Sequence, residues 1–471
     1  MKDTIRQKAN FFIFIVASIA ALGGFVLGFD AGVIVDGKDQ ITSEFLLSNF
    51  QWSIITSISV LGALIAVPIS GRFTDRFGTK TMLLITSIGF LTGLTLTATA
   101  YNLFQLITGR FLIGICIGIA SFSAPLFISE IAPPSIRGSM VLLNGVAITA
   151  GQTLSFLASY FLHDISSFSW RIILCIEILP ALALFIGMLF MPKSPRWVAK
   201  NNGIESARKI LIKIRGKNYP FLEKELSEIH QNIFHAVSRT GFKNLFSKKM
   251  APVLMVGMGL GILQQFVGIS AIMYYGPVIF ESVGFHSIKN AIFATFFIGL
   301  INLIFTIVSA FLVDHVGRRF LLLTGSLIAA ISMLLISISS LGWFNEKWGI
   351  FFMASYMIGY CIGLGSLFWV VIAEIYPLHI RGSAMSVVTS VQCTANFIVT
   401  ITFLQVFNRL GNSETFLLFG MMCLTAFVFV YFYVPETKRV PLELIEENLN
   451  KGKKTRYLGQ RADDPRYETI Y

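Results

Sequence analysis

Three charged side chains, Asp30, Arg110 and Glu177, fall inside the first, fourth and sixth apolar segments of this chain. A charged residue at the centre of a bilayer costs roughly 2.5–3.5 kcal/mol on insertion scales, and such residues usually mark ion or proton pathways. Burial favours a neutral acid, whereas a nearby cation favours a carboxylate. We therefore predict that Asp30 binds and releases a proton beside Arg110. The alternative is a carboxylate that is hydrogen-bonded in a packed interior.

Glu177 is the second buried carboxylate, and the pattern leaves its role open between two interpretations. If it lies close to Asp30, the two carboxyl groups titrate as a coupled pair, and Glu177 tunes proton binding at Asp30. Otherwise it is a structural carboxylate that is hydrogen-bonded to a neighbouring helix.

The composition shows which kind of structure must position these residues. Of the 471 residues, 55% are hydrophobic and only 13% are charged, whereas soluble domains carry about 25% charged residues. This excludes an ordinary soluble enzyme, a nucleic-acid-binding protein and a disordered chain. Apolar runs near 20 residues predict transmembrane helices. We predict twelve spans, at 11–34, 51–70, 80–100, 104–128, 139–162, 171–191, 250–273, 290–313, 320–341, 349–373, 383–407 and 414–434.

The distribution of positive charge predicts the orientation, because Lys and Arg are enriched in cytoplasmic loops. With the N-terminus inside, only five of the 37 Lys and Arg fall in outer segments. Both termini are therefore predicted to be cytoplasmic, in a cell membrane that is most simply a bacterial inner membrane. The five outer residues are Lys38, Arg171, Lys289, Lys347 and Arg409.

Three motifs occur twice, roughly 240 residues apart, which indicates an internal repeat. The pairs are 75–80 with 314–319, 113–118 with 358–363, and 130–139 with 374–383. Two parallel six-helix halves with a site between them are typical of alternating-access transporters. We predict an all-α membrane protein with two pseudo-symmetric six-helix bundles, divided into 1–197, a linker 198–249, 250–434 and a tail 435–471. Amphipathic spacing predicts short helices at 204–214 and 221–237, and a further helix is predicted over 441–449 in the polar tail.

Further motifs, in order along the chain, resemble those of the sugar porter family of the major facilitator superfamily. The similarity runs from about residue 25 to 447 and is nearest to bacterial proton-coupled sugar and polyol symporters such as the xylose–proton symporter. The motifs are Gly28–Asp30, Gly71–Gly78, Gly109–Leu112, Glu130–Arg137, Trp170–Arg171, Pro192–Arg196, Gln264–Gln265 with Tyr274–Tyr275, Asp314–Arg319, Trp369 with Glu374–Arg381, and Pro435–Lys438.

The resemblance implies roles for polar side chains within the spans. A monosaccharide offers hydroxyls and an apolar face, so amides and an aromatic ring suit it. Asp30, Arg110 and Glu177 stand at positions that the resemblance associates with proton coupling in the family's symporters. The implied sugar contacts are Gln152, Gln264, Gln265, Ser270, Asn302, Trp369, Gln392 and Asn396. For each amide, the alternative is interhelical hydrogen bonding.

Four residues depart from the family pattern. Ser270 replaces the usual Asn, Cys393 a frequent Trp, and Ser366 the Pro of a Gly-Pro motif. The first two predict a roomier, less polar cavity, and the third an altered bend in the tenth span. Lys193 replaces a usual Glu and so reverses one charge of the inner network, whereas the second half keeps Glu436.

Charged residues at the inner helix ends have two interpretations. They either fix the topology or form ion pairs that close an inner gate; a network of individually weak pairs can bias two conformations. Tyr274 and Tyr275 are predicted to gate the outer mouth or to pack as aromatics. The charged gating candidates are Asp75, Arg76, Glu130, Arg137, Asp314, Arg318, Arg319, Glu374, Arg381 and Glu436.

These patterns together predict a secondary active transporter that couples protons to uptake of a monosaccharide or polyol and acts as a monomer. No cofactor, metal or nucleic acid is expected, and no enzymatic constellation appears. Three alternatives remain: a facilitative sugar uniporter, a proton-linked carrier of another solute, and a nutrient sensor that does not transport. Asp30 argues against the uniporter, and the ordered motifs argue against a carrier of another solute. Sensors of this fold usually carry a long tail, whereas only 37 residues follow Val434.

Overall fold

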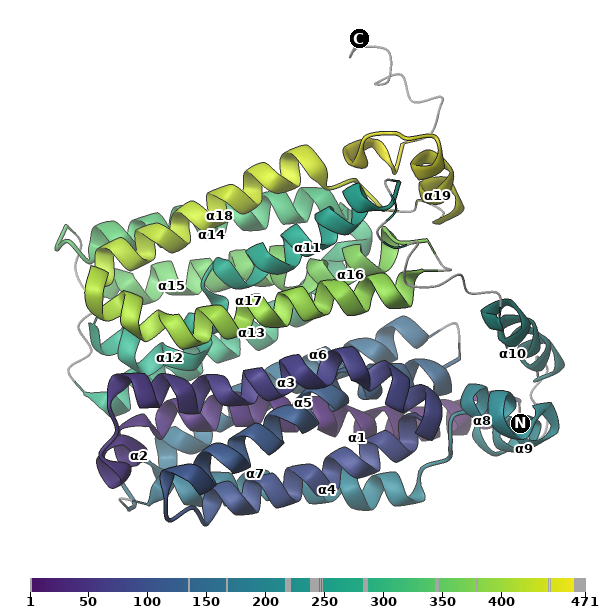
Figure 1. Ribbon diagram of the computed structural model, residues 1–471, viewed down its shortest axis with the longest axis horizontal. Helices are drawn as coiled ribbons and strands as arrows, with labels where there is room; N and C mark the ends of the chain where they lie inside the picture. The colour runs from purple at the N-terminus through teal and green to yellow at the C-terminus, as the bar shows by residue number, and fades with distance from the viewer. Residues whose placement is uncertain are drawn as a thin grey trace, which may run out of the picture. The chain divides into compact units, whose positions relative to one another are not determined.

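A computed structural model of the chain is entirely helical over the residues that it describes (Figure 1). Twelve helical spans are long and apolar enough to cross a membrane, as predicted. Contacts divide the chain into two compact units, which the following paragraphs take separately. The described residues are 2–133, 136–166, 168–216, 222–237, 245, 247, 249–282, 287–343, 347–377, 380–438, 440 and 442–460.

The first unit comprises residues 1–238, 273–281 and 285–300. It contains the first six spans, three short helices after them, and parts of α12 (Ile269–Ser282) and α13 (Ile288–Val316). Its other helices are α1 (Lys2–Asp36), α2 (Lys38–Phe45), α3 (Asn49–Phe77), α4 (Thr79–Ala98), α5 (Leu103–Ile131), α6 (Arg137–Leu162), α7 (Ser169–Phe190), α8 (Pro195–Asn202), α9 (Ile204–Arg215) and α10 (Leu222–Val237).

The second unit comprises residues 239–272, 282–284 and 301–471. It holds the remainder of α12 and α13, the last four spans and the described part of the tail. Its other elements are α11 (Ala251–Phe266), α14 (Arg318–Ser339), α15 (Lys347–Tyr360), the π-helix η2 (Cys361–Gly365), α16 (Ser366–Glu374), α17 (Arg381–Leu410), α18 (Asn412–Tyr433), α19 (Leu442–Asn450) and the 3₁₀ turn η3 (Thr455–Tyr457).

The helix limits differ from the predicted spans where polar residues continue a helix. The second span runs to Phe77 instead of ending near residue 70, because its polar last turns remain helical. The seventh reaches Glu281 instead of residue 273 and consists of α11 and α12. Between these two helices Gly268 has φ +98°, a value that L side chains rarely adopt. Apolar length therefore located the spans but not their ends.

The tenth span bends without a proline. It passes from α15 through η2 into α16, and within η2 Gly363 has φ −96° and ψ −109°. A π-bulge is an established cause of helix kinks and is frequent at functional sites. Ser366, which follows η2 directly, stands where the predicted family pattern has proline. The bend is thus retained, with Gly363 as the residue that departs from helical geometry.

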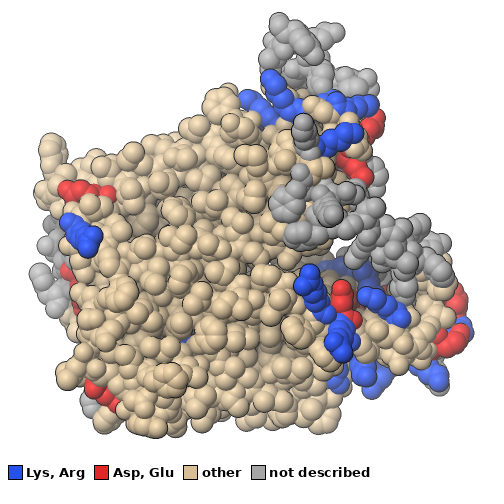
Figure 2. Space-filling view, in the orientation of Figure 1, with Lys and Arg blue, Asp and Glu red and all other residues tan. Residues whose placement is uncertain are grey.

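The predicted short helices are confirmed as α9, α10 and α19. We call the end of each unit that carries α8–α10 or α19 its inner end (Figure 1). Figure 2 shows Lys and Arg gathered there, whereas the visible flanks of the helices carry almost no charge. This is the charge distribution that a chain spanning a bilayer requires.

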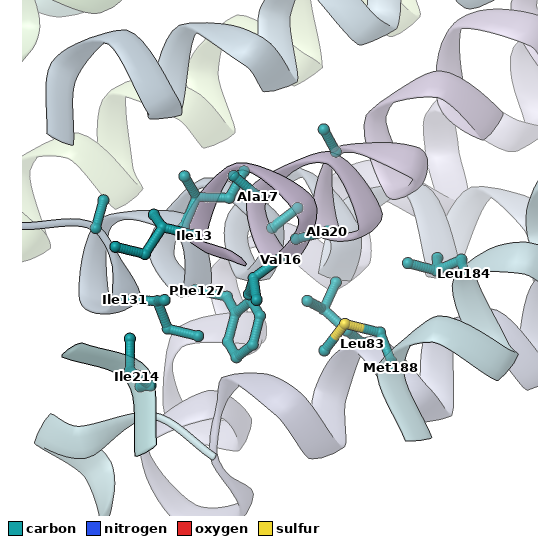
Figure 3. Packing of buried hydrophobic residues seen from close by; sticks show 14 residues of the cluster. Ile13, Val16, Ala17, Ala20, Leu83, Phe127, Ile131, Leu184, Met188 and Ile214 are labelled. Carbon is teal, nitrogen blue, oxygen red and sulfur yellow. The ribbon is translucent and has the colours of Figure 1, made fainter. Parts of the chain in front are cut away.

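A buried apolar cluster joins α9 to the membrane spans of the first unit. The cluster contains Ile214 of α9, Ile13 of α1 and Ile131 of α5, together with Phe127 and Met188, and Figure 3 shows Ile214 at one edge of it. Burial of large aliphatic side chains contributes about 1.5–3 kcal/mol each. The short helices of the first unit are therefore packed against the ends of the spans.

Candidate functional site

Asp30 and Arg110 form an ion pair inside the first unit. Asp30 on α1 is 1% exposed and Arg110 on α5 is fully buried. The Arg110 Nη1 donates to the Asp30 Oδ1, and Nη2 donates to the Ser59 hydroxyl of α3 over 3.2 Å. Removing either partner would leave a buried, uncompensated charge. Three spans thus meet at one carboxylate that has a single cation beside it among the described residues.

Closely packed glycines hold the helix of Asp30 in place. On α1, Gly28 faces the backbone of α6. A Cβ added at Gly28 would collide with the Ile148 carbonyl and lie 3.0 Å from the backbone nitrogen of Gln152. Gly151 of α6 makes the reciprocal approach to Phe25 of α1. Small residues at such crossings let membrane helices approach closely and gain dispersion energy. The position of Asp30 is therefore fixed by backbone contact.

The helix of Arg110 is held in the same manner. At Gly114, one turn along α5, a Cβ would collide with the Ser59 carbonyl of α3. Gly118, one turn farther, would place a Cβ 2.7 Å from the Ala63 carbonyl. The close approach of α3 brings the Ser59 hydroxyl within reach of Arg110. Ser59 was not predicted from the sequence, because a serine in an apolar run gives no distinguishing signal.

Glu177 on α7 is fully buried, and neither carboxyl oxygen has a hydrogen-bond partner among the described residues. Asp30 and Arg110 both lie close enough to act on it electrostatically. The alternative of a carboxylate bonded to a neighbouring helix therefore finds no support in the described contacts. Buried polar groups without partners are rare in proteins and often have a functional explanation.

Four of the predicted sugar contacts form one hydrogen-bonded cluster in the second unit. The Gln264 Oε1 accepts from the Gln392 Nε2 over 3.2 Å and from the Gln265 Nε2 over 3.4 Å. The Ser270 hydroxyl donates to the Gln265 Oε1 over 2.6 Å. Although Gln264 and Gln265 are consecutive, both side chains enter the cluster. Helices α11, α12 and α17 contribute to it.

Asn302 and Asn396 lie outside this cluster in the hydrogen-bond pattern. The Asn302 Oδ1 accepts from the Cys361 thiol over 3.1 Å and from the Thr306 hydroxyl over 3.3 Å. The Asn396 Oδ1 accepts from the Thr400 hydroxyl, one turn along α17, over 3.1 Å. Neither amide nitrogen donates a hydrogen bond to a described residue, so both groups retain donor capacity.

The remaining predicted sugar contacts are Gln152 and Trp369. Gln152 on α6 is 9% exposed, and its amide makes no hydrogen bond with a described residue. Trp369 on α16 is 45% exposed and meets Phe368 edge to face, with ring centroids 5.0 Å apart. An uncommitted amide and an accessible indole face are the kinds of groups that a sugar ring can use.

Of the two predicted gating tyrosines, Tyr275 is almost fully buried and Tyr274 is half-buried. The Tyr275 hydroxyl lies 2.8 Å from the hydroxyl of Thr56 on α3. Tyr275 also has φ −134° and ψ 21°, so α12 is kinked there. This contact ties α12 to the second span within the first unit.

The inner end of the second unit carries a charged network around α14. Arg318 holds Glu374 with two bonds, Nη2 to Oε1 at 2.9 Å and Nε to Oε2 at 3.1 Å. The Thr437 hydroxyl donates to the same Oε2 over 2.6 Å. Bidentate, charge-assisted bonds of this kind are stronger than neutral ones. The network thus joins α14, α16 and the segment after α18.

Glu436 caps the start of α14. Its two carboxyl oxygens accept from the backbone nitrogens of Arg318 and Arg319, at 3.0 and 3.1 Å. A carboxylate at a helix N-terminus satisfies otherwise free N–H groups and complements the helix dipole. Arg381 belongs to the same end but donates to the Tyr376 carbonyl over 3.3 Å.

Among the described residues, the corresponding end of the first unit shows no counterpart of the Arg318–Glu374 ion pair. Glu130 accepts from the Thr79 hydroxyl over 2.9 Å, where the repeat has Arg318 in the second half. Lys193, which replaces the family's usual Glu, is exposed and lies 5.6 Å from the Trp197 ring. Asp75 and Arg76 are exposed. Two substitutions have therefore removed the arginine and the capping carboxylate from this half.

Two predicted gating residues remain. Arg137 is half-buried at the start of α6. The side chain of Asp314 lies outside the described residues.

Arg215 is an inner contact that the sequence did not reveal. It is 4% exposed and donates from Nη1 to the Ile131 carbonyl at the end of α5 over 2.6 Å. Its Nη2 donates to the Glu225 carboxylate of α10 over 2.9 Å. The sequence showed only an amphipathic helix, because partners from other helices leave no local pattern. Arg215 fastens α9 and α10 to the inner end of the fourth span.

Comparison with known protein families identifies the family of this chain. A family model described as "Sugar (and other) transporter" matches residues 16–449. The chain belongs to this sugar porter family of the major facilitator superfamily. The resemblance predicted from the ordered motifs is confirmed. The protein is accordingly a multi-pass sugar transporter and not an enzyme.

Relatives of this transporter include several proteins named for sugars. The chain is 35% identical over 454 residues to the galactose-proton symporter of Escherichia coli, covering 95% of this chain and 96% of that one. It is 32% identical to a glucose transporter of Staphylococcus epidermidis, covering 94% and 98%. A D-xylose transporter of Levilactobacillus brevis is 30% identical, covering 94% and 97%.

Solved structures extend the similarity to the whole fold. The inward-open xylose transporter of E. coli superposes with a TM-score of 0.81 at 29% identity, covering 92% of this chain and 99% of that one. The proton:xylose symporter bound to 6-bromo-6-deoxy-D-glucose gives 0.78 at 27% identity, covering 95% and 98%. The predicted major facilitator fold is therefore confirmed.

A first prediction concerns the stability of this transporter. Replacing Arg318 with alanine removes both bonds to Glu374 and leaves that carboxylate with the Thr437 hydroxyl. Hydrogen bonds to charged groups contribute about 1.5–3 kcal/mol, so we expect Arg318→Ala to lower the free energy of unfolding by roughly that amount. Thermal unfolding in detergent measures it. Arg409→Ala, at an exposed arginine, is the matched control; an equal loss in both variants would contradict the prediction.

Proposed function

We propose that this sugar transporter is a proton-coupled symporter that moves a monosaccharide or polyol into the cell by alternating access. The observation that carries the proposal is the buried Asp30–Arg110 pair, together with Glu177, whose carboxyl group has no hydrogen-bond partner among the described residues. A facilitative carrier has no need for ionisable groups at this depth, and the bilayer makes them expensive. The printed names of two relatives, the galactose-proton and arabinose-proton symporters, support the same direction.

In the proposed mechanism Asp30 carries the coupled proton. A proton that arrives from outside neutralises the carboxylate and weakens its bond to Arg110. Arg110 retains its bond to Ser59, so the guanidinium is not left without a partner. The protonated, sugar-loaded site can then reorient, and loss of the proton to the cytoplasm restores the ion pair. Without the proton, the site would have to reorient with the buried ion pair still intact, which we expect to be unfavourable. Movement of the sugar is therefore coupled to movement of the proton.

Glu177 has a supporting role in this proposal. An ionised carboxylate without partners would be expensive at this depth, so we expect the buried group to carry its proton. Glutamine has nearly the same shape and no charge. Glu177→Gln should therefore change the free energy of unfolding by less than about 1 kcal/mol, whereas breaking a buried ion pair costs ~3–5 kcal/mol. Thermal unfolding of both variants, Glu177→Gln and Arg110→Leu, checks this contrast; a large loss in the first would contradict it.

The predicted sugar contacts are proposed to bind the sugar. The cluster of Gln264, Gln265, Ser270 and Gln392 offers donors and acceptors suited to ring hydroxyls. Trp369 supplies the aromatic face, and Gln152, Asn302 and Asn396 complete the proposed set. The Ser270 hydroxyl is committed to Gln265, which limits what this serine offers to a substrate. A sugar or polyol, a proton and the lipid bilayer are the proposed partners.

The charged inner ends are proposed to form the inner gate, with both termini in the cytoplasm. The Arg318–Glu374 pair and the Glu436 cap would carry most of this gate. The first half contributes less, because Thr79 and Lys193 replace the charges that would mirror them. Tyr275 and its contact to Thr56 are proposed to belong to the opposite, outer gate.

Uptake into proteoliposomes tests the proposed function. Purified protein would be reconstituted and supplied with D-galactose, D-glucose, D-xylose, L-arabinose and myo-inositol, each with and without an inward proton gradient. Symport predicts saturable uptake of at least one of these solutes that exceeds equilibrium and collapses with an uncoupler. Uptake that only equilibrates and ignores the gradient would indicate a uniporter. Absence of uptake for every sugar would favour the sensor interpretation and overturn symport.

A further inference from the structure

Gln264 uses every donor and acceptor of its amide within the second unit. Its oxygen accepts from Gln392 and Gln265, as described above. Its nitrogen donates to the Leu364 carbonyl over 3.2 Å and to the Gly365 carbonyl over 3.3 Å. An amide has two donor hydrogens and two acceptor lone pairs. A sugar hydroxyl can therefore bond to Gln264 only by displacing one of these internal bonds.

The two bonds that the Gln264 nitrogen donates lie at the break of the tenth span. Leu364 and Gly365 are the last residues of η2, directly before α16. Gly363, whose backbone dihedrals leave the helical region, immediately precedes them. The Gln264 nitrogen thus ties α11, in the seventh span, to the main chain at the bend of the tenth.

A second tie runs in the opposite direction. Tyr356 on α15 is fully buried, and its hydroxyl donates to the Val267 carbonyl over 3.0 Å. Val267 directly follows α11, and the next residue, Gly268, has φ +98°, so this carbonyl lies at the break of the seventh span. Each broken span therefore presents a side chain that hydrogen-bonds the backbone at the break of the other.

We propose that Gln264 is the residue through which the tenth span senses the sugar, and that Tyr356 is a positioning residue that holds the two breaks together. A sugar hydroxyl whose oxygen accepts from the Gln264 nitrogen displaces a bond to the Leu364 or Gly365 carbonyl, and the bend in the tenth span becomes free to move. Without sugar, the saturated amide keeps the bend fixed. The inference rests on the proposed sugar site and adds to it a mechanical consequence of occupancy.

Cys361 provides a natural reporter of this movement. It is the first residue of η2, is 1% exposed, and its thiol donates to the Asn302 Oδ1 over 3.1 Å. A buried thiol reacts with a maleimide only when its surroundings open. Loosening of the bend should therefore expose Cys361. The other four cysteines, which would be replaced by serine, are Cys116, Cys175, Cys393 and Cys423.

The experiment measures the rate at which N-ethylmaleimide labels Cys361 in full-length protein in proteoliposomes, with the same panel of five solutes. A transported solute should accelerate labelling by about tenfold, the factor that corresponds to ~1.4 kcal/mol. Gln264→Leu should label at the fast rate with or without solute. Either no acceleration by a solute that is taken up, or protection by it, would overturn the proposal.

Tyr356→Phe keeps the ring and removes only the hydroxyl, so it remains informative if Gln264→Leu does not fold. It should raise the labelling rate several-fold without sugar, while the KM for uptake changes by less than about twofold, because the hydroxyl bonds Val267 and not the sugar. Tyr433→Phe, at an exposed tyrosine on α18, is the control and should change neither. Unchanged basal labelling in Tyr356→Phe would refute the positioning role. Lost proton dependence with intact sugar-driven labelling would refute symport alone.

Discussion

Replacing Asp30 with asparagine is expected to abolish uphill accumulation of sugar while exchange of sugar across the membrane continues. Asparagine keeps the size of the side chain and an oxygen that can accept from Arg110, so the helices around the pair should stay in place. It cannot carry a proton. Reorientation therefore no longer requires protonation, and the gradient of protons no longer drives the sugar.

The size of this effect follows from the energy of the gradient. One pH unit is worth 1.36 kcal/mol per proton, so a carrier that moves one proton per sugar can hold about a tenfold concentration ratio. Asp30→Asn should reduce that ratio to about one. Counterflow of radiolabelled sugar would measure exchange, and net uptake under a pH gradient would measure accumulation.

A matched substitution separates coupling from general damage. Asp39 is an exposed aspartate on α2, outside the predicted spans. Asp39→Asn removes the same charge at the surface and should leave the accumulation ratio unchanged. If Asp30→Asn still concentrates sugar against its gradient, Asp30 is not the proton carrier and Glu177 becomes the next candidate to test.

The second large effect is expected from a single methyl group at Gly28. In a free helix alanine is more favourable than glycine by about 1 kcal/mol. At Gly28, however, the new Cβ would collide with the Ile148 carbonyl, and backbone atoms cannot rotate away. Helices α1 and α6 would have to separate. We expect Gly28→Ala to lower the free energy of unfolding by about 2–3 kcal/mol, as overpacking of a close interface does.

Gly145, on α6, supplies the matched control. A Cβ added there would meet no atom within 4 Å, so Gly145→Ala should be neutral or slightly stabilising. Both variants add one methyl group to the α1–α6 pair. Only the methyl group at Gly28 faces the backbone of the other helix. Yield of monodisperse protein and thermal unfolding in detergent compare them. Equal stability of both variants would show that α1 and α6 do not cross as closely as the structure has them.

The loss at Gly28 should also reach the transport site. Asp30 lies two residues after Gly28 on α1, and the Cβ added at Gly28 would lie 3.0 Å from the backbone nitrogen of Gln152. Separation of the helices would shift both side chains. Any folded fraction of Gly28→Ala should therefore show weaker coupling as well as lower stability, whereas Gly145→Ala should show neither.

The sequence alone determined the class of this protein, its twelve spans and its family. A bilayer permits few backbone structures, so apolar length predicts helices reliably, and ordered motifs identify a family without knowledge of contacts. The intramembrane charges Asp30 and Arg110 were also evident as partners, because a lone charge in lipid demands one. The short helices α9 and α10 followed from amphipathic spacing, and α19 was predicted within the polar tail.

Only the tertiary structure decided which polar groups are already engaged. Ser59 bonds to Arg110, Glu177 has no partner among the described residues, and Gln264 spends its whole amide on internal bonds. These contacts join residues that are far apart in the sequence, and no local period encodes them. The bend at Gly363 likewise formed without the proline whose loss had suggested a change. Helix packing sets such contacts through close backbone approach, which a one-dimensional pattern does not record.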